Sequence, residues 1–161
     1  NPRTTLVGQT LTIAGAIRTA TNNAVDFTTG RGWFIDLPDS GERQNVASQL
    51  VSGTLLVPTT VPSATVCSPG GYSWFNYFNA STGGGVTSSN IVSSKLNSPI
   101  VGFNVVNIDT DGDGASETKS VNVVTAGGEI IPPCVGPDCD LFAGSLGTFK
   151  AKRAIWREFI Q

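Results

Sequence analysis

The stretch Tyr72-Ser73-Trp74-Phe75-Asn76-Tyr77-Phe78 is the densest run of aromatic residues in the chain. Aromatic side chains favour the pleated surface of a β-sheet. The run ends at Asn79-Ala80-Ser81-Thr82-Gly83-Gly84-Gly85, a segment typical of a glycine-rich turn. We therefore predict a strand over residues 72–78 that ends in a turn.

Shorter runs of β-branched and aromatic residues lie on both sides of this strand, without helical periodicity between them. Pro58 and Pro62 interrupt two of these runs and indicate an edge strand, a bulge or a strand end. The fold class is predicted as all-β with antiparallel sheets. The further predicted strands cover residues 31–37, 53–57, 59–61, 100–106 and 120–124, the last two as a pair joined by an acidic loop.

The composition is that of an exported protein with a polar but weakly charged surface. The chain has 161 residues, of which 14% are charged, and it is rich in serine, threonine and asparagine. Its length fits one globular unit, with a β-rich region over 1–125, an irregular Gly/Pro/Cys loop over 126–148 and a basic closing segment over 149–161, helical or extended. No apolar run is long enough for a membrane span. A net charge of −2 argues against nucleic-acid binding.

Histidine is absent, which excludes Ser-His-Asp triads, Cys-His pairs and histidine-dependent metalloprotease motifs. Asp36, Asp39 and Glu42 lie close together in the sequence, as paired catalytic acids can. Pro38 and Gly41 among them favour a structural turn over such chemistry. We expect a protein that is not an enzyme.

The clearest candidate site is the run Asp109-Thr110-Asp111-Gly112-Asp113-Gly114-Ala115-Ser116-Glu117. Carboxylates at loop positions one, three and five converge when the backbone turns sharply, and a glycine at position six permits that turn. The donors are all hard oxygens, so calcium is the predicted cofactor. The predicted ligands are Asp109, Asp111, Asp113, the backbone carbonyl of Ala115, and Glu117.

Position twelve of this loop is Ser120, where an EF-hand has a bidentate glutamate, and no helical pattern flanks it. We therefore predict a compact nine-residue calcium loop between two strands. A solvated acidic hairpin turn is the alternative, since Asp-Gly is a common turn dipeptide.

Three cysteines are present, an odd number with spacing that does not suit a zinc site. In an exported protein, a disulfide between Cys134 and Cys139 is the first prediction. Cys67 would then be free or paired outside this chain. A Cys67–Cys134 disulfide is the second possibility.

Longer strings carry a likeness to a known family. They are Thr21-Asn22-Asn23-Ala24-Val25-Asp26-Phe27, Arg31-Gly32-Trp33-Phe34-Ile35-Asp36-Leu37-Pro38-Asp39-Ser40-Gly41-Glu42-Arg43, Gly70-Gly71-Tyr72-Ser73-Trp74 after Cys67, and Ala154-Ile155-Trp156-Arg157-Glu158. Together they resemble the C-terminal part of the PilY1/PilC family of type IV pilus tip-associated proteins, over residues 9–161. The resemblance implies blades of a partial β-propeller. It also implies a calcium loop of the Asp-x-Asp-x-Asp-Gly-x-x-Asp kind, with Glu117 in place of the last aspartate.

What the resemblance implies for function is a calcium-binding structural or adhesive module, located outside the cell on a bacterial surface or pilus. Such a module supports pilus biogenesis, adhesion and twitching motility. The expected partners are pilins or minor pilins and the remainder of a longer parent protein, because this chain lacks methionine and resembles only the end of the family. The alternative is a processed subunit that self-assembles into an extracellular filament through open β edges.

Overall fold

The computed structural model of the protein describes residues 2–65, 70–108, 118–133 and 141. These residues form strands and loops, with a single 3₁₀ turn (η1, Pro2–Thr5) and no α-helix. The all-β prediction with antiparallel sheets is confirmed at this level. Among the described residues, no helix has the length and apolar character to cross a membrane.

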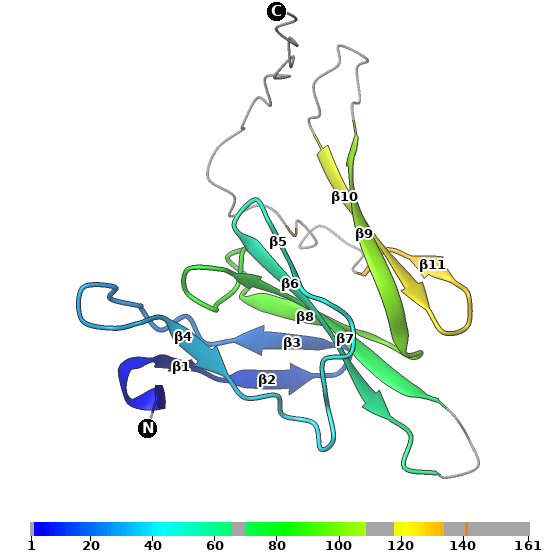
Figure 1. The fold of residues 1–161 in the computed structure, drawn as a ribbon, viewed down its shortest axis with the longest axis horizontal. Coiled ribbons are helices and arrows are strands. Elements are labelled where there is room, and N and C mark those ends of the chain that lie inside the picture. Colours follow the sequence, from blue (N-terminus) through cyan, green and yellow to red (C-terminus); the bar gives the residue numbers. More distant parts are fainter. Residues whose placement is uncertain (1, 66–69, 109–117, 134–140, 142–161) are drawn as a thin grey trace, which may run out of the picture.

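A six-stranded antiparallel sheet forms the centre of the molecule (Figure 1). Every neighbouring pair in it is antiparallel. In spatial order its strands are β2 (Leu11–Ala14), β3 (Ile17–Ala20), β8 (Ile91–Leu96), β7 (Gly71–Asn79), β6 (Thr54–Pro62) and β5 (Gln49–Val51).

The aromatic strand β7 lies inside this sheet, between β8 and β6, and it is buried on both faces. Because successive side chains of a strand point to opposite faces, Phe75 and Tyr77 lie on one face and Trp74 and Phe78 on the other. Phe75 is fully buried, and Trp74 and Tyr77 are each 1% exposed. The density of aromatic residues that predicted this strand therefore reflects two apolar interfaces.

The two segments predicted around Pro58 are one continuous nine-residue strand, β6. On one side β6 pairs with β7 along its whole length, including Pro58 opposite Phe75. On the other side β5 reaches only as far as Leu56. Pro58 therefore lies where β6 is an edge, so its missing N–H breaks no ladder hydrogen bond.

A second, three-stranded antiparallel sheet covers one face of the large sheet. It contains β9 (Ile100–Ile108), β10 (Thr118–Thr125) and β11 (Ile130–Ile131), in the order β11-β10-β9. The predicted pairing of the strands around the acidic loop is confirmed, whereas β11 falls within the range predicted as irregular. The core between the two sheets contains Leu56, Phe75, Tyr77, Val86, Leu96, Ile100, Val121, Val123 and Leu141.

The opposite face of the large sheet is covered by β1 (Val7–Gln9) and β4 (Trp33–Ile35), which form a small parallel pair. Trp33 and Ile35 of β4 pack against a second core cluster of Leu11, Ala20, Phe78 and Val92. This pair is parallel, unlike the strand pairs of the two antiparallel sheets. No hairpin joins β1 and β4, because β2 and β3 lie between them in the chain.

The glycine-rich turn after β7 is packed against its surroundings. A Cβ on Gly83, which has φ +75°, would lie 2.4 Å from the Trp33 ring, and the Trp33 indole N–H donates to the Ala80 carbonyl at 2.9 Å. The turn is therefore a contact surface for β4.

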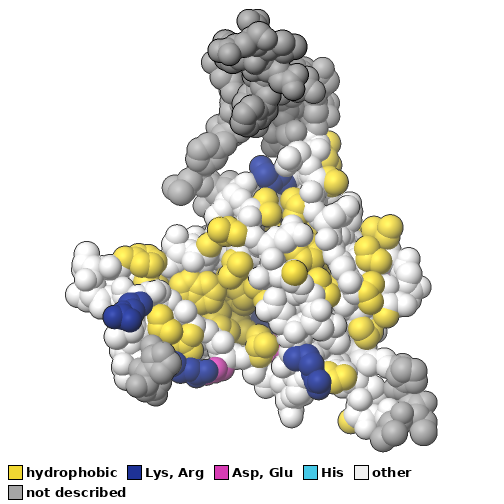
Figure 2. Space-filling model, in the orientation of Figure 1, with side chains coloured by type: hydrophobic (Ala, Val, Ile, Leu, Met, Phe, Trp, Pro, Cys, Tyr) yellow, Lys and Arg dark blue, Asp and Glu magenta, His cyan; other side chains and the backbone are white. Residues whose placement is uncertain are grey.

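The two sheets and the small parallel pair form stacked layers, without a closed barrel or propeller among the described residues. The β-propeller blades implied by the resemblance remain a prediction. The surface is sparsely charged, with few acidic or basic side chains visible on the face drawn in Figure 2.

Candidate functional site

The predicted calcium ligands, Asp109, Asp111, Asp113, Ala115 and Glu117, lie outside the described residues. What is described is the pair of strand ends that flank them, since Ile108 of β9 pairs with Thr118 of β10. Elsewhere in the described part of the chain, no group of three or more His, Cys, Asp or Glu residues is arranged to hold a metal ion. The calcium site therefore remains a prediction.

The cysteine predictions likewise concern residues outside the described ranges. Cys67 lies in 66–69, and Cys134 and Cys139 lie in 134–140. The Cys134–Cys139 disulfide and its Cys67–Cys134 alternative stay as predictions.

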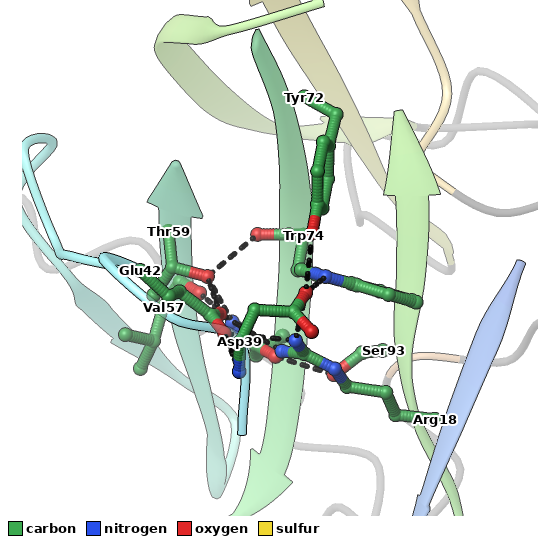
Figure 3. A network of polar contacts seen from close by, with 9 residues as sticks. Arg18, Asp39, Glu42, Val57, Thr59, Tyr72, Trp74 and Ser93 are labelled. Carbon is green, nitrogen blue, oxygen red and sulfur yellow. Dashed lines mark hydrogen bonds and ion pairs between the residues drawn. The ribbon is translucent and has the colours of Figure 1, made fainter. Parts of the chain in front are cut away.

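A buried arginine, Arg18 on β3, is the main polar feature of the described residues (Figure 3). Its guanidinium donates to both carboxylate oxygens of Glu42 at 2.8 Å and to Asp39 Oδ2 at 2.8 Å. The side chains of Arg18 and Glu42 are fully buried and that of Asp39 is 17% exposed. We call Arg18, Asp39, Glu42 and their hydrogen-bond partners the Arg18 centre.

Aromatic residues of β7 complete one side of the Arg18 centre. The Trp74 indole N–H and the Tyr72 hydroxyl donate to Asp39 Oδ2 at 2.8 Å and 2.9 Å. The Arg18 guanidinium carbon also lies 4.0 Å from the centroid of the Trp74 ring, within range of a cation–π contact. Lys95 of β8 lies over the Tyr72 ring at 4.0 Å.

Neutral polar side chains complete the other side. The Thr59 hydroxyl donates to Glu42 Oε1 at 2.5 Å, and Asn76 donates to Thr59 at 3.1 Å and to the Val57 carbonyl at 2.8 Å. Ser93 donates to the Asn76 carbonyl oxygen. The centre thus joins four strands of the large sheet: β3, β6, β7 and β8.

The local sequence explains why the carboxylates of Asp39 and Glu42 lie close together. The predicted turn at Pro38-Asp39-Ser40-Gly41 is present, with Gly41 at φ +75° and the Glu42 N–H donating to the Asp39 carbonyl at 3.1 Å. This tight turn directs Asp39 and Glu42 to the same side. Asp36 lies outside it and forms an exposed ion pair with Arg3 at 2.8 Å.

The electrostatics of the centre favour a charged Asp39. Burial raises the pKa of its carboxyl, but the hydrogen bonds from Trp74 and Tyr72 and the charge of Arg18 outweigh it, so the pKa lies below its usual range. Burial and the hydrogen bond to Asp39 raise the pKa of Tyr72. The lowered pKa favours the charged form of Asp39 at neutral pH, and the raised pKa favours the protonated hydroxyl of Tyr72.

This arrangement suits a structural role better than acid–base chemistry. The Glu42 carboxylate oxygens accept hydrogen bonds from Arg18, Thr59 and the Asp39 N–H. Asp39 Oδ2 accepts three hydrogen bonds. Two carboxylates that hold the same guanidinium are not placed on opposite sides of a substrate. The centre instead fastens the segment after β4 onto the large sheet, and the backbone bridge between Arg43 and Thr60 continues that attachment.

Stability should fall in acid because of Asp39. A carboxyl whose pKa is lowered by folding stabilises the native state above its unfolded pKa of about 3.9, and this contribution is lost as the pH falls through the folded pKa. Urea unfolding from pH 6 down to pH 3, an experimental range of about three units, should show a steeper loss for wild type than for Asp39→Asn. Equal slopes would contradict the assignment.

The pattern that could have indicated this centre is the position of Arg18. It lies between Ile17 and Thr19 in a predominantly apolar segment. Such a segment indicates a buried strand, and a buried arginine requires an acidic partner. Sequence reasoning placed Asp39 and Glu42 in a turn but did not connect them with Arg18, because the pairing spans 21 and 24 residues.

Comparison of the chain with models of protein families, with curated proteins and with solved structures finds no match.

Proposed function

We propose that the protein is a calcium-binding structural and adhesive module of a type IV pilus-associated surface protein. The observation that carries the proposal is the acidic run 109–117 between two strand ends that pair with each other, Ile108 and Thr118. Opposed residues in an antiparallel pair lie about 5 Å apart. The nine residues between them therefore join two positions that lie about 5 Å apart.

This constraint favours a cation. The run carries four carboxylates, and the basic residue nearest to it in the sequence is Lys119 on β10. Closing the loop brings like charges together, and a divalent ion bound by their oxygens removes the repulsion. Calcium bound to the folded hairpin stabilises the native state, because ligands that bind only the native state shift the folding equilibrium.

The Arg18 centre supports a structural module that is not an enzyme. The string that carries the most specific part of the resemblance, Asp36-Leu37-Pro38-Asp39-Ser40-Gly41-Glu42-Arg43, contributes Asp39 and Glu42 to a buried attachment. Its side chains hold the fold. The module would act outside the cell, with pilins or minor pilins and the rest of its parent protein as partners in pilus biogenesis, adhesion and twitching motility.

Calcium-dependent melting tests the metal site. Saturating calcium, at about 100 times the dissociation constant, should raise the melting temperature of the wild type by about 5–10 °C relative to a chelator. Asp111→Ala and Asp113→Ala should abolish that rise, whereas Asp36→Asn, at an exposed acid outside the run, should keep it. A wild type that melts at the same temperature with and without calcium would refute the site.

The pilus assignment is tested in a bacterium that encodes this chain. Asp113→Ala in the parent protein should change the number of surface pili or the twitching rate, and Asp36→Asn should not. If both strains behave as the wild type while purified protein still binds calcium, the metal site stands and the pilus function is refuted.

A further inference from the structure

We propose that two copies of this chain pair through β9 to form a closed dimer. β9 is the end strand of the three-stranded sheet, and no other described strand pairs with its outer edge. It has nine residues, Ile-Val-Gly-Phe-Asn-Val-Val-Asn-Ile, with no charged residue and no proline. Three apolar side chains on it remain exposed: Val101 at 58%, Val106 at 38% and Ile108 at 41%.

The edges of the other sheet are less suited to pairing. β5 has three residues and β2 has four, and short edge strands are one way in which proteins prevent edge-to-edge association. A long, uncharged and partly apolar edge is a template for an added strand. Figure 1 shows the ends of β9 and β10 next to the acidic run extending past the large sheet.

We take the added strand to be a second copy, because an uncharged strand can pair with itself without repulsion. Both partners would present the same neutral strand, so the pairing brings no like charges into register. The acidic run begins immediately after Ile108. In an antiparallel, two-fold arrangement the acidic runs of the two copies leave at opposite ends of the joined sheet, whereas a parallel arrangement would place them side by side.

The first residue of β9 limits the register. Ile100 is fully buried and its N–H donates to the Ser73 hydroxyl at 2.8 Å, so this end is occupied within the chain. A two-fold axis close to Val105 uses the remaining residues and sets Gly102 opposite Ile108 and Asn104 opposite Val106. The two three-stranded sheets would then form one six-stranded sheet. Because the same edge serves both copies, the assembly closes at two chains.

Light scattering after size-exclusion chromatography, over a dilution series, tests the dimer. The wild type should be dimeric at high concentration and dissociate on dilution. Asn104→Lys places a charge on the exposed edge strand and should raise the dissociation constant at least about tenfold. Asn122→Lys is the matched control, because Asn122 is the register partner of Asn104 on the central strand β10. It should leave the dimer intact.

Melting of both variants at low concentration shows that they are folded. A wild type that stays monomeric at every concentration, or one that forms larger polymers, would overturn the closed dimer. So would Asn122→Lys dissociating it as strongly as Asn104→Lys, because the contact would then lie on the face of the sheet. In the dimer, β9 amides should exchange hydrogen more slowly as concentration rises; exchange that is independent of concentration would also overturn the proposal.

Discussion

Arg18→Ala is expected to lower the free energy of unfolding by about 3–5 kcal/mol, because it leaves the buried carboxylates of Asp39 and Glu42 without their cation. The Arg18 side chain is fully buried and those of Glu42 and Asp39 are 0% and 17% exposed, so water replaces little of the lost interaction. Urea or thermal unfolding at neutral pH measures the effect.

Arg3→Ala is the matched control. Arg3 also pairs with an aspartate at 2.8 Å, but both side chains are more than half exposed, so a small change is expected. A second comparison separates lost attraction from stranded charge. Adding Asp39→Asn and Glu42→Gln to Arg18→Ala should recover part of the stability, because most of the loss comes from uncompensated buried charge. A loss for Arg18→Ala no larger than for Arg3→Ala would contradict the role of the centre.

Gly71→Ala is expected to destabilise the fold by at least about 3 kcal/mol, because two costs combine at the start of β7. Gly71 has φ +139°, in a region that only glycine readily adopts, and such strain costs about 1–3 kcal/mol. In addition, a Cβ there would lie 2.2 Å from the Val61 carbonyl oxygen and 3.0 Å from the Pro62 Cα. Both obstacles are backbone atoms of the paired strand β6 and cannot move aside as a side chain could.

The neighbouring glycine provides the control. A Cβ on Gly70 would meet no atom of the described residues within 4 Å, so Gly70→Ala should change the melting temperature little. The pair distinguishes a steric requirement from a general need for flexibility in the Gly70-Gly71 segment. Equal destabilisation by the two substitutions, measured by thermal unfolding, would contradict the steric explanation.

Several strands were predictable because their signals are local. Strand preference is visible in consecutive residues of three segments: the aromatic run of β7 and the β-branched residues of β9 and β10. Turn preference is visible in the same way at Pro38 and Gly41. An edge strand was one of three alternatives predicted at Pro58, beside a bulge and a strand end, since a missing N–H limits any strand in the same way. The prediction split β6 at that proline because only the tertiary structure shows where β5 ends.

The Arg18 centre and the parallel pair were not predictable for a different reason. Arg18 meets Asp39 and Glu42, and β1 meets β4, only after the chain has folded back on itself. The periodicity of apolar residues reports local secondary structure and does not indicate which distant segments will pair. The calcium ligands, by contrast, could be proposed from the sequence, because their pattern lies within nine consecutive residues.

From its sequence alone this protein is determined to be an all-β chain with a sparsely charged surface, without histidine chemistry, and with one compact run of oxygen donors. Those properties depend on residue type and short spacing. Tertiary structure decided that β7 is buried on both faces, that Arg18 pairs with two carboxylates of a distant turn, and that no other described strand pairs with the outer edge of β9. Burial and pairing depend on which surfaces meet, and water leaves those surfaces only when segments far apart in the sequence pack together.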